Sequence, residues 1–98
     1  MILPKKVKVG RKWYVVHKKE TGVQYGMVCY KMGIIHVATK NKTGKYSKTL
    51  TRNDVSDTFW HELTHAILHD MGDFRNNNEN FVAAFSSRLN IAINSAKF

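Results

Sequence analysis

Ninety-eight residues fit one small domain; 43% of them are hydrophobic, and the formal net charge is +9 at pH 7. No run of about twenty apolar residues occurs, so a membrane-spanning helix is excluded, and we expect no signal peptide because the first residues lack an apolar segment. The single cysteine, Cys29, excludes an internal disulfide and favours a reducing cytoplasm. We therefore expect one domain over residues 1–98, a cytoplasmic monomer with no membrane partner.

Residues 1–52 form a basic, strand-rich half. Runs of β-branched and aromatic residues between turn residues predict strands at residues 7–9, 12–17, 25–30 and 34–39. Gly10 indicates a tight turn between the first two strands, and residues 31–33 turn the last two into a hairpin. Residues 41–48 are predicted to form a polar loop.

The charge of this half has two interpretations. Residues 1–52 hold 13 lysines and arginines against one acid, Glu20, whereas residues 53–98 hold three against six. Aromatic side chains such as Trp13 and Tyr14 lie among the lysines. The half is either a contact surface for nucleic acid or an acidic protein, or a solvated sheet face whose lysines protect its edges from aggregation.

A first helix is predicted after residue 52. Five apolar residues follow at helical spacing and form one stripe: Phe59, Trp60, Leu63, Ala66 and Ile67. Asn53 or Asp54 is a suitable N-cap, with Asp57 in the first turn, and Gly72 stands where a C-cap glycine belongs.

Beside this stripe, residues 61–65 read His-Glu-Leu-Thr-His. Residues four apart share a helix face, so His61 and His65 can reach one zinc ion at distances of about 2.0–2.1 Å. Glu62 lies next to them, where it can act as general base on a water molecule that the metal activates.

A catalytic zinc normally has three protein ligands, and two residues are candidates for the third. His69 continues the four-residue spacing, but it lies about 12 Å from His61 along a continuous helix. Glu79 opens a second amphipathic helix, whose apolar residues we expect to pack antiparallel on the first helix: Phe81, Val82, Phe85, Leu89, Ala92 and Ile93. This packing would bring Glu79 beside the metal, although a first-turn acid can also simply stabilise its helix.

Strands first and helices afterwards indicate an α+β fold, with a small antiparallel sheet packed on a helix pair. The basic half would supply the sheet, and residues 53–98 would supply the metal-binding helices. His36, in the strand expected beside the cleft, either polarises a substrate carbonyl or is an ordinary strand histidine.

The chain resembles the minimal gluzincin peptidases in the stretch Trp60–His61–Glu62–Leu63–Thr64–His65. As in those peptidases, a loop follows this stretch, and Glu79 then stands at the start of a helix. These peptidases include the ImmA/IrrE-like and SprT-like groups and small phage-encoded proteins. The resemblance implies a zincin-like fold, zinc ligands at His61, His65 and Glu79, and Glu62 as general base. It also implies that the strand before the helix lines the substrate cleft and pairs with an extended peptide.

These observations lead to two functional hypotheses. The first is a zinc metallopeptidase that hydrolyses a peptide bond in a protein substrate, in the host cytoplasm if the chain is phage-encoded. The alternative is a catalytically weak or inactive zincin-fold binding module, whose basic surface contacts nucleic acid or an acidic host protein.

Overall fold

The computed structural model of the chain describes residues 3–19, 25–43 and 46–98, without the side chains of residues 41–48. The described elements follow in chain order: β1 (Lys6–Val9), β2 (Lys12–Lys19), β3 (Gly26–Cys29), β4 (Ile34–Ala38), β5 (Lys40–Thr43), β6 (Tyr46–Thr49), α1 (Arg52–Met71), the short 3₁₀ helix η1 (Phe74–Asn77) and α2 (Glu79–Ser95). The predicted α+β class is confirmed. Among the described residues, no helix is both long and apolar enough to cross a membrane.

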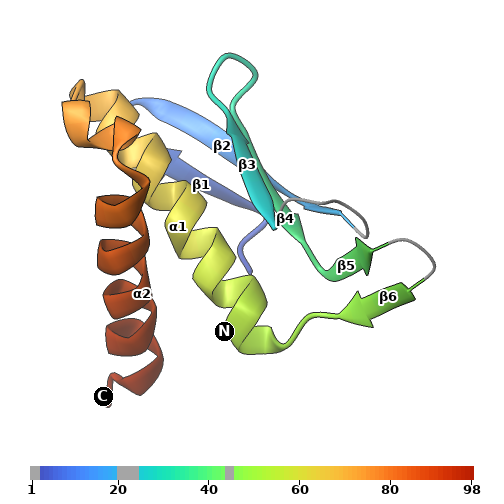
Figure 1. The fold of residues 1–98 in the computed structure, drawn as a ribbon. Coiled ribbons are helices and arrows are strands. Elements are labelled where there is room, and N and C mark those ends of the chain that lie inside the picture. Colours follow the sequence, from blue (N-terminus) through green and yellow to red (C-terminus); the bar gives the residue numbers. More distant parts are fainter. Residues whose placement is uncertain (1–2, 20–24, 44–45) are drawn as a thin grey trace.

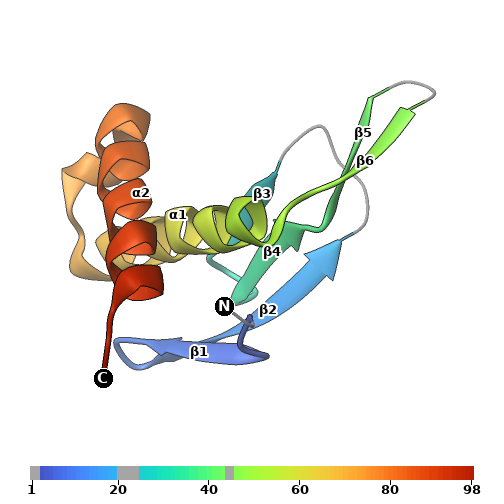
Figure 2. The same cartoon turned by 90° about the horizontal axis from the view of Figure 1, so that it is seen from below.

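The four strands β1 to β4 form one sheet in the order β1-β2-β4-β3. Figures 1 and 2 show α1 lying between this sheet and α2. Buried side chains of α1, among them Phe59 and Leu63, pack with Tyr14, Ile35 and Val37 of the sheet. The core therefore lies between the inner face of the sheet and α1.

The prediction of an antiparallel sheet was wrong, because β2 and β4 run parallel. β1 is antiparallel to β2, and β3 is antiparallel to β4, as hairpins require. The parallel pair arises because β3 lies beyond β4 at the edge of the sheet. This order gives β4 a neighbour on each side, and β4 carries Ile35 and Val37, both of which are fully buried.

The predicted polar loop at residues 41–48 was also wrong over its described residues. β5 and β6 pair antiparallel there as a separate two-stranded ribbon. Their backbone groups bond to each other, so the ribbon forms without the apolar alternation that marks a strand packed on a core.

Helix α1 begins two or three residues earlier than predicted. Its N-cap is Thr51, not Asn53 or Asp54. The Thr51 side chain accepts from the Asp54 backbone N–H at 3.0 Å, and the Asp54 carboxylate accepts from the Thr51 N–H at 3.1 Å, which is a capping box. The predicted end of the helix is confirmed, because Gly72 adopts φ 65° and its N–H bonds to carbonyls of the last turn.

The contact between α1 and α2 includes buried polar side chains and is only in part the packing of two apolar stripes that we predicted: Val82 is buried and Phe81 and Leu89 are partly buried, but Ala92 is exposed. The buried residues of α2 are Val82, Ser86 and Asn90, whereas Phe85 and Ile93 are about half exposed. The Ser56 hydroxyl of α1 donates to Asn90 Oδ1 at 2.6 Å, and Asn90 Nδ2 donates to Asn53 Oδ1 at 3.2 Å. Hydrogen bonds thus hold α2 in place on α1.

Candidate metal centre and catalytic pocket

The two histidines of the motif lie on one face of α1, as predicted. Their ring centroids are 5.0 Å apart, and the side chains are mostly buried. Thr64, between them in sequence, is buried, donates its hydroxyl proton to the Trp60 carbonyl and does not line the pocket beside the histidines. The helix therefore presents His61 and His65 together.

Glu79 completes a group of three possible ligands. It is the first residue of α2, whose N-cap Asn78 accepts from the Phe81 N–H at 3.0 Å. One Glu79 carboxylate oxygen lies 3.1 Å from His61 Nε2, and the other lies 2.8 Å from His65 Nε2. The three possible donor atoms lie within 4.8 Å of one another, so the group could hold a metal ion.

His69, the other candidate, does not join this group. Its ring stacks on Tyr30 with a centroid separation of 3.9 Å. As the rise of a continuous helix requires, it lies two turns beyond His61. Among the residues the structure describes, the triad of possible ligands contains Glu79 and excludes His69.

The donor set suits zinc. Two imidazole nitrogens and one carboxylate oxygen are a typical protein ligand set for catalytic zinc, which leaves a fourth position open. Metal-binding histidines usually donate their second ring N–H to an oxygen acceptor, which fixes the tautomer. His65 has this arrangement, because its Nδ1 donates to Asn76 Oδ1 at 2.6 Å while its Nε2 faces Glu79.

Asn76 is a site residue that the sequence did not reveal. It lies in η1, the turn between the two helices, and its amide also donates from Nδ2 to the Tyr30 hydroxyl at 3.2 Å. The amide therefore links the candidate ligand His65 to Tyr30, in the turn that follows β3. The only signal in the sequence is the run Asn76–Asn77–Asn78, in which nothing distinguishes the three residues.

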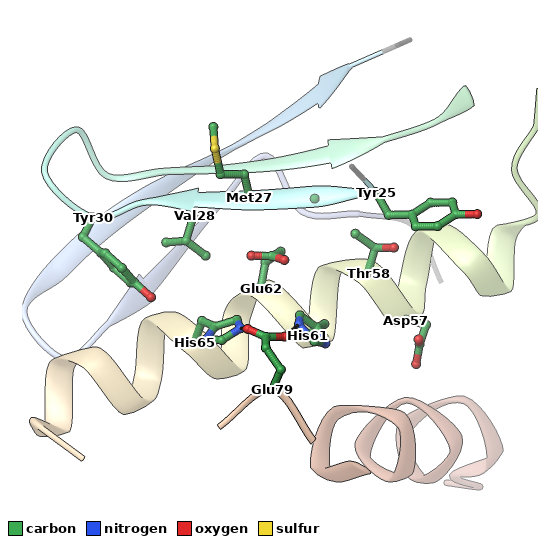
Figure 3. A pocket seen from close by; sticks show the side chains of 11 residues that line it. Tyr25, Met27, Val28, Tyr30, Asp57, Thr58, His61, Glu62, His65 and Glu79 are labelled. Atoms are coloured by element: carbon green, nitrogen blue, oxygen red, sulfur yellow. Dashed lines mark hydrogen bonds and ion pairs between the residues drawn. The ribbon is translucent and has the colours of Figure 1, made fainter. Parts of the chain in front are cut away.

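Glu62 points toward β3 and lies beside the histidines in the same pocket (Figure 3). Burial raises the pKa of its carboxyl to about 7; the nearby His65 opposes this rise, and Glu79 adds to it. β3 can lie this close because Gly26 has no side chain. A Cβ at Gly26 would lie 2.6 Å from Thr58 Cγ2 and 2.9 Å from Glu62 Cγ.

The pocket has a volume of about 630 Å³ and lies between α1, the start of α2 and strand β3. Its sheet side is formed by residues 25–28 and Tyr30, whose hydroxyl points toward His65 in Figure 3. The strand beside the cleft is thus β3, not β4 as predicted. Of the two interpretations of His36, the structure favours the ordinary strand histidine, since His36 lies outside the pocket lining and its Nδ1 is 3.4 Å from that of His17.

In comparisons with known proteins, the chain matches no family model, and no curated protein or solved structure is significantly similar to it. The function must therefore be inferred from the site itself.

Proposed function

We propose that the protein is a zinc-dependent metallopeptidase with a zincin-like fold. The observation that carries this proposal is the convergence of His61, His65 and Glu79, with Glu62 beside them in one pocket. Zinc held by the three side chains would act as a Lewis acid on water and on a peptide carbonyl.

Glu62 is the general base in this proposal. It removes a proton from the attacking water and passes the proton to the leaving nitrogen when the peptide bond breaks. Its burial supports this role, because a carboxyl whose pKa is raised to about 7 can both accept and return a proton near neutral pH.

Tyr30 is a candidate for stabilising the substrate carbonyl oxygen as negative charge develops on it. Its hydroxyl accepts a hydrogen bond from Asn76, so its own proton is available for donation into the pocket. A donor in this position would act together with the metal in the transition state.

An extended peptide is the substrate that best fits the pocket. Among the described strands, β3 pairs with β4 alone and lies at the edge of the sheet, beside the pocket. The free backbone groups of an edge strand can pair with an added strand. A peptide paired with β3 would pass the candidate metal ligands and Glu62.

Zinc analysis of metal-replete protein tests the metal centre. We expect about one zinc per chain, much weaker binding in Glu79→Gln, and unchanged binding in the control His69→Ala. Absence of zinc from the wild type, or equal loss in both variants, would refute the site.

Mass spectrometry of peptides released from an unfolded protein such as casein tests the chemistry. We expect Glu62→Gln to keep its zinc and to lose about 10²- to 10⁴-fold in cleavage rate. Full activity in this variant would refute the mechanism. A binding function on the basic half would use other residues, and it would survive the loss of Glu62.

A further inference from the structure

The face of the sheet opposite α1 is not covered by either helix (Figures 1 and 2). Strand residues that alternate with the buried core positions point to this side, and the pairing of the strands places them in neighbouring rows. We call this surface the outer sheet face, and it comprises Lys6, Lys8, Trp13, Val15, His17, Met27 and His36.

Large apolar side chains are exposed on this face. Trp13 is 52% exposed, Val15 54% and Met27 45%. A tryptophan on a strand usually contributes to a core, as Tyr14 does from the next position, where it is buried on the inner face. Trp13 therefore offers a large aromatic surface to a partner.

The surroundings of Trp13 are positively charged. Lys6 Nζ lies 4.7 Å and Lys8 Nζ lies 5.8 Å from the centre of the Trp13 ring. Of the five lysines in the four strands of the sheet, those at positions 6, 8 and 19 alternate to the outer side, and the four strands contain no acidic residue. The potential over the face favours a polyanion.

We propose that the outer sheet face binds single-stranded nucleic acid. Trp13 stacks on a base, while Lys6 and Lys8 contact the phosphates beside it. A single strand exposes both bases and phosphates, and proteins bind it with aromatic side chains set in a basic surface. An acidic protein would use the lysines but not the ring.

Duplex DNA fits this surface less well. Reading its major groove requires a helix or ribbon that carries basic side chains into the groove. Helix α1 carries Arg52 but four acids, and α2 carries Arg88 as its one basic residue. The β5–β6 ribbon contains Lys40, Lys42 and Lys48, but it forms a sheet separate from the outer sheet face. Lys6 and Lys8 flank the exposed Trp13 ring on the outer sheet face, and a base that is paired within a duplex cannot stack on this ring.

Fluorescence anisotropy with a labelled oligothymidine of about fifteen nucleotides tests the charge component. The variant Lys6→Gln/Lys8→Gln removes two charges from the face, and the control Arg88→Gln/Lys97→Gln removes two exposed charges elsewhere. With about 0.7 counterions released per phosphate contact, the face variant should lower the slope of log affinity against log salt by about 1.4. The control should keep the wild-type slope.

The tryptophans test the stacking component. Trp13→Ala should weaken binding about 5- to 160-fold, which corresponds to the range found when a stacking aromatic is removed. Trp13 lies outside the buried core cluster, so its loss should leave the fold intact, which circular dichroism would verify. Binding should quench the fluorescence of the wild type and of Trp60→Phe, and this quenching should be absent in Trp13→Phe.

Three results would overturn the proposal. Equal losses in the face variant and in the charge control would show a response to net charge alone. Equal or tighter binding of a duplex, or of polyglutamate, would show that single strands are not preferred. Quenching that persists in Trp13→Phe would show that the strand lies elsewhere.

Discussion

Asn76→Ala tests whether the interhelix turn controls the metal centre. The Asn76 amide oxygen accepts the 2.6 Å hydrogen bond from His65 Nδ1. With a metal bound, this bond would keep the proton on Nδ1, so that Nε2, which faces Glu79, would supply its lone pair to the metal. Alanine removes the acceptor, so the ring loses its fixed orientation and tautomer.

The loss of such a hydrogen bond typically lowers metal affinity about 10- to 100-fold, which corresponds to about 1.4 to 2.7 kcal/mol. We expect the upper part of this range, because His65 is 9% exposed and few water molecules can replace the lost acceptor. Asn76→Asp should keep the wild-type affinity or exceed it, because a carboxylate accepts the same bond and increases the basicity of the ring.

Competition for zinc with a chromophoric chelator measures these affinities. The matched control is Asn77→Ala, which changes the next residue of the same turn, an exposed position. If Asn76→Ala binds zinc within about twofold of the wild type, or if Asn77→Ala loses as much, the role of Asn76 in orienting His65 is wrong.

Two further substitutions test how the pocket and the helix pair are built. Gly26→Ala places a Cβ 2.6 Å from Thr58 Cγ2, so we expect the free energy of unfolding, measured by urea denaturation, to fall by about 1–3 kcal/mol. Adding Thr58→Ser, which removes that methyl group, should restore part of the lost stability. If the double variant is no more stable than Gly26→Ala, the clash is not the cause of the loss. Asn90→Ala removes the amide bonded to Ser56 and Asn53 and should cost about 1–3 kcal/mol. The control Asn80→Ala changes an exposed residue and should leave the free energy of unfolding almost unchanged. Equal losses in the two variants would show that the buried hydrogen bonds of Asn90 do not stabilise the protein.

The local parts of the site were predictable from the sequence. The four-residue spacing of His61 and His65 depends only on the helix period, and the same geometry argues against His69. The place of Glu79 at the start of a second helix also followed from a local pattern, whereas its position beside the histidines was inferred from a packing of apolar stripes that the structure shows only in part.

The parts that depend on contacts between distant segments were not predictable. Strand β4 lies in the middle of the sheet because it pairs with β2, although β3 lies between these two strands in the sequence. The burial pattern of β2 or of β4 alone does not reveal this pairing. The different roles of the three consecutive asparagines could not be predicted from the sequence either. Asn76 bonds to His65, Asn77 is exposed, and Asn78 caps α2, although their residue type and local sequence are alike.

The polar contact between the helices explains how one carboxylate comes to lie beside two histidines. Apolar stripes pack in several registers at similar free energy, whereas buried hydrogen bonds are satisfied in one. The bond between Ser56 and Asn90 fixes α2 along α1. A slip of one helical turn, about 5.4 Å, would break this bond and withdraw Glu79 from both rings. The buried amide of Asn90 thus adds a directional constraint to the packing of Val82, and this constraint favours the register that places the third candidate ligand beside the histidines.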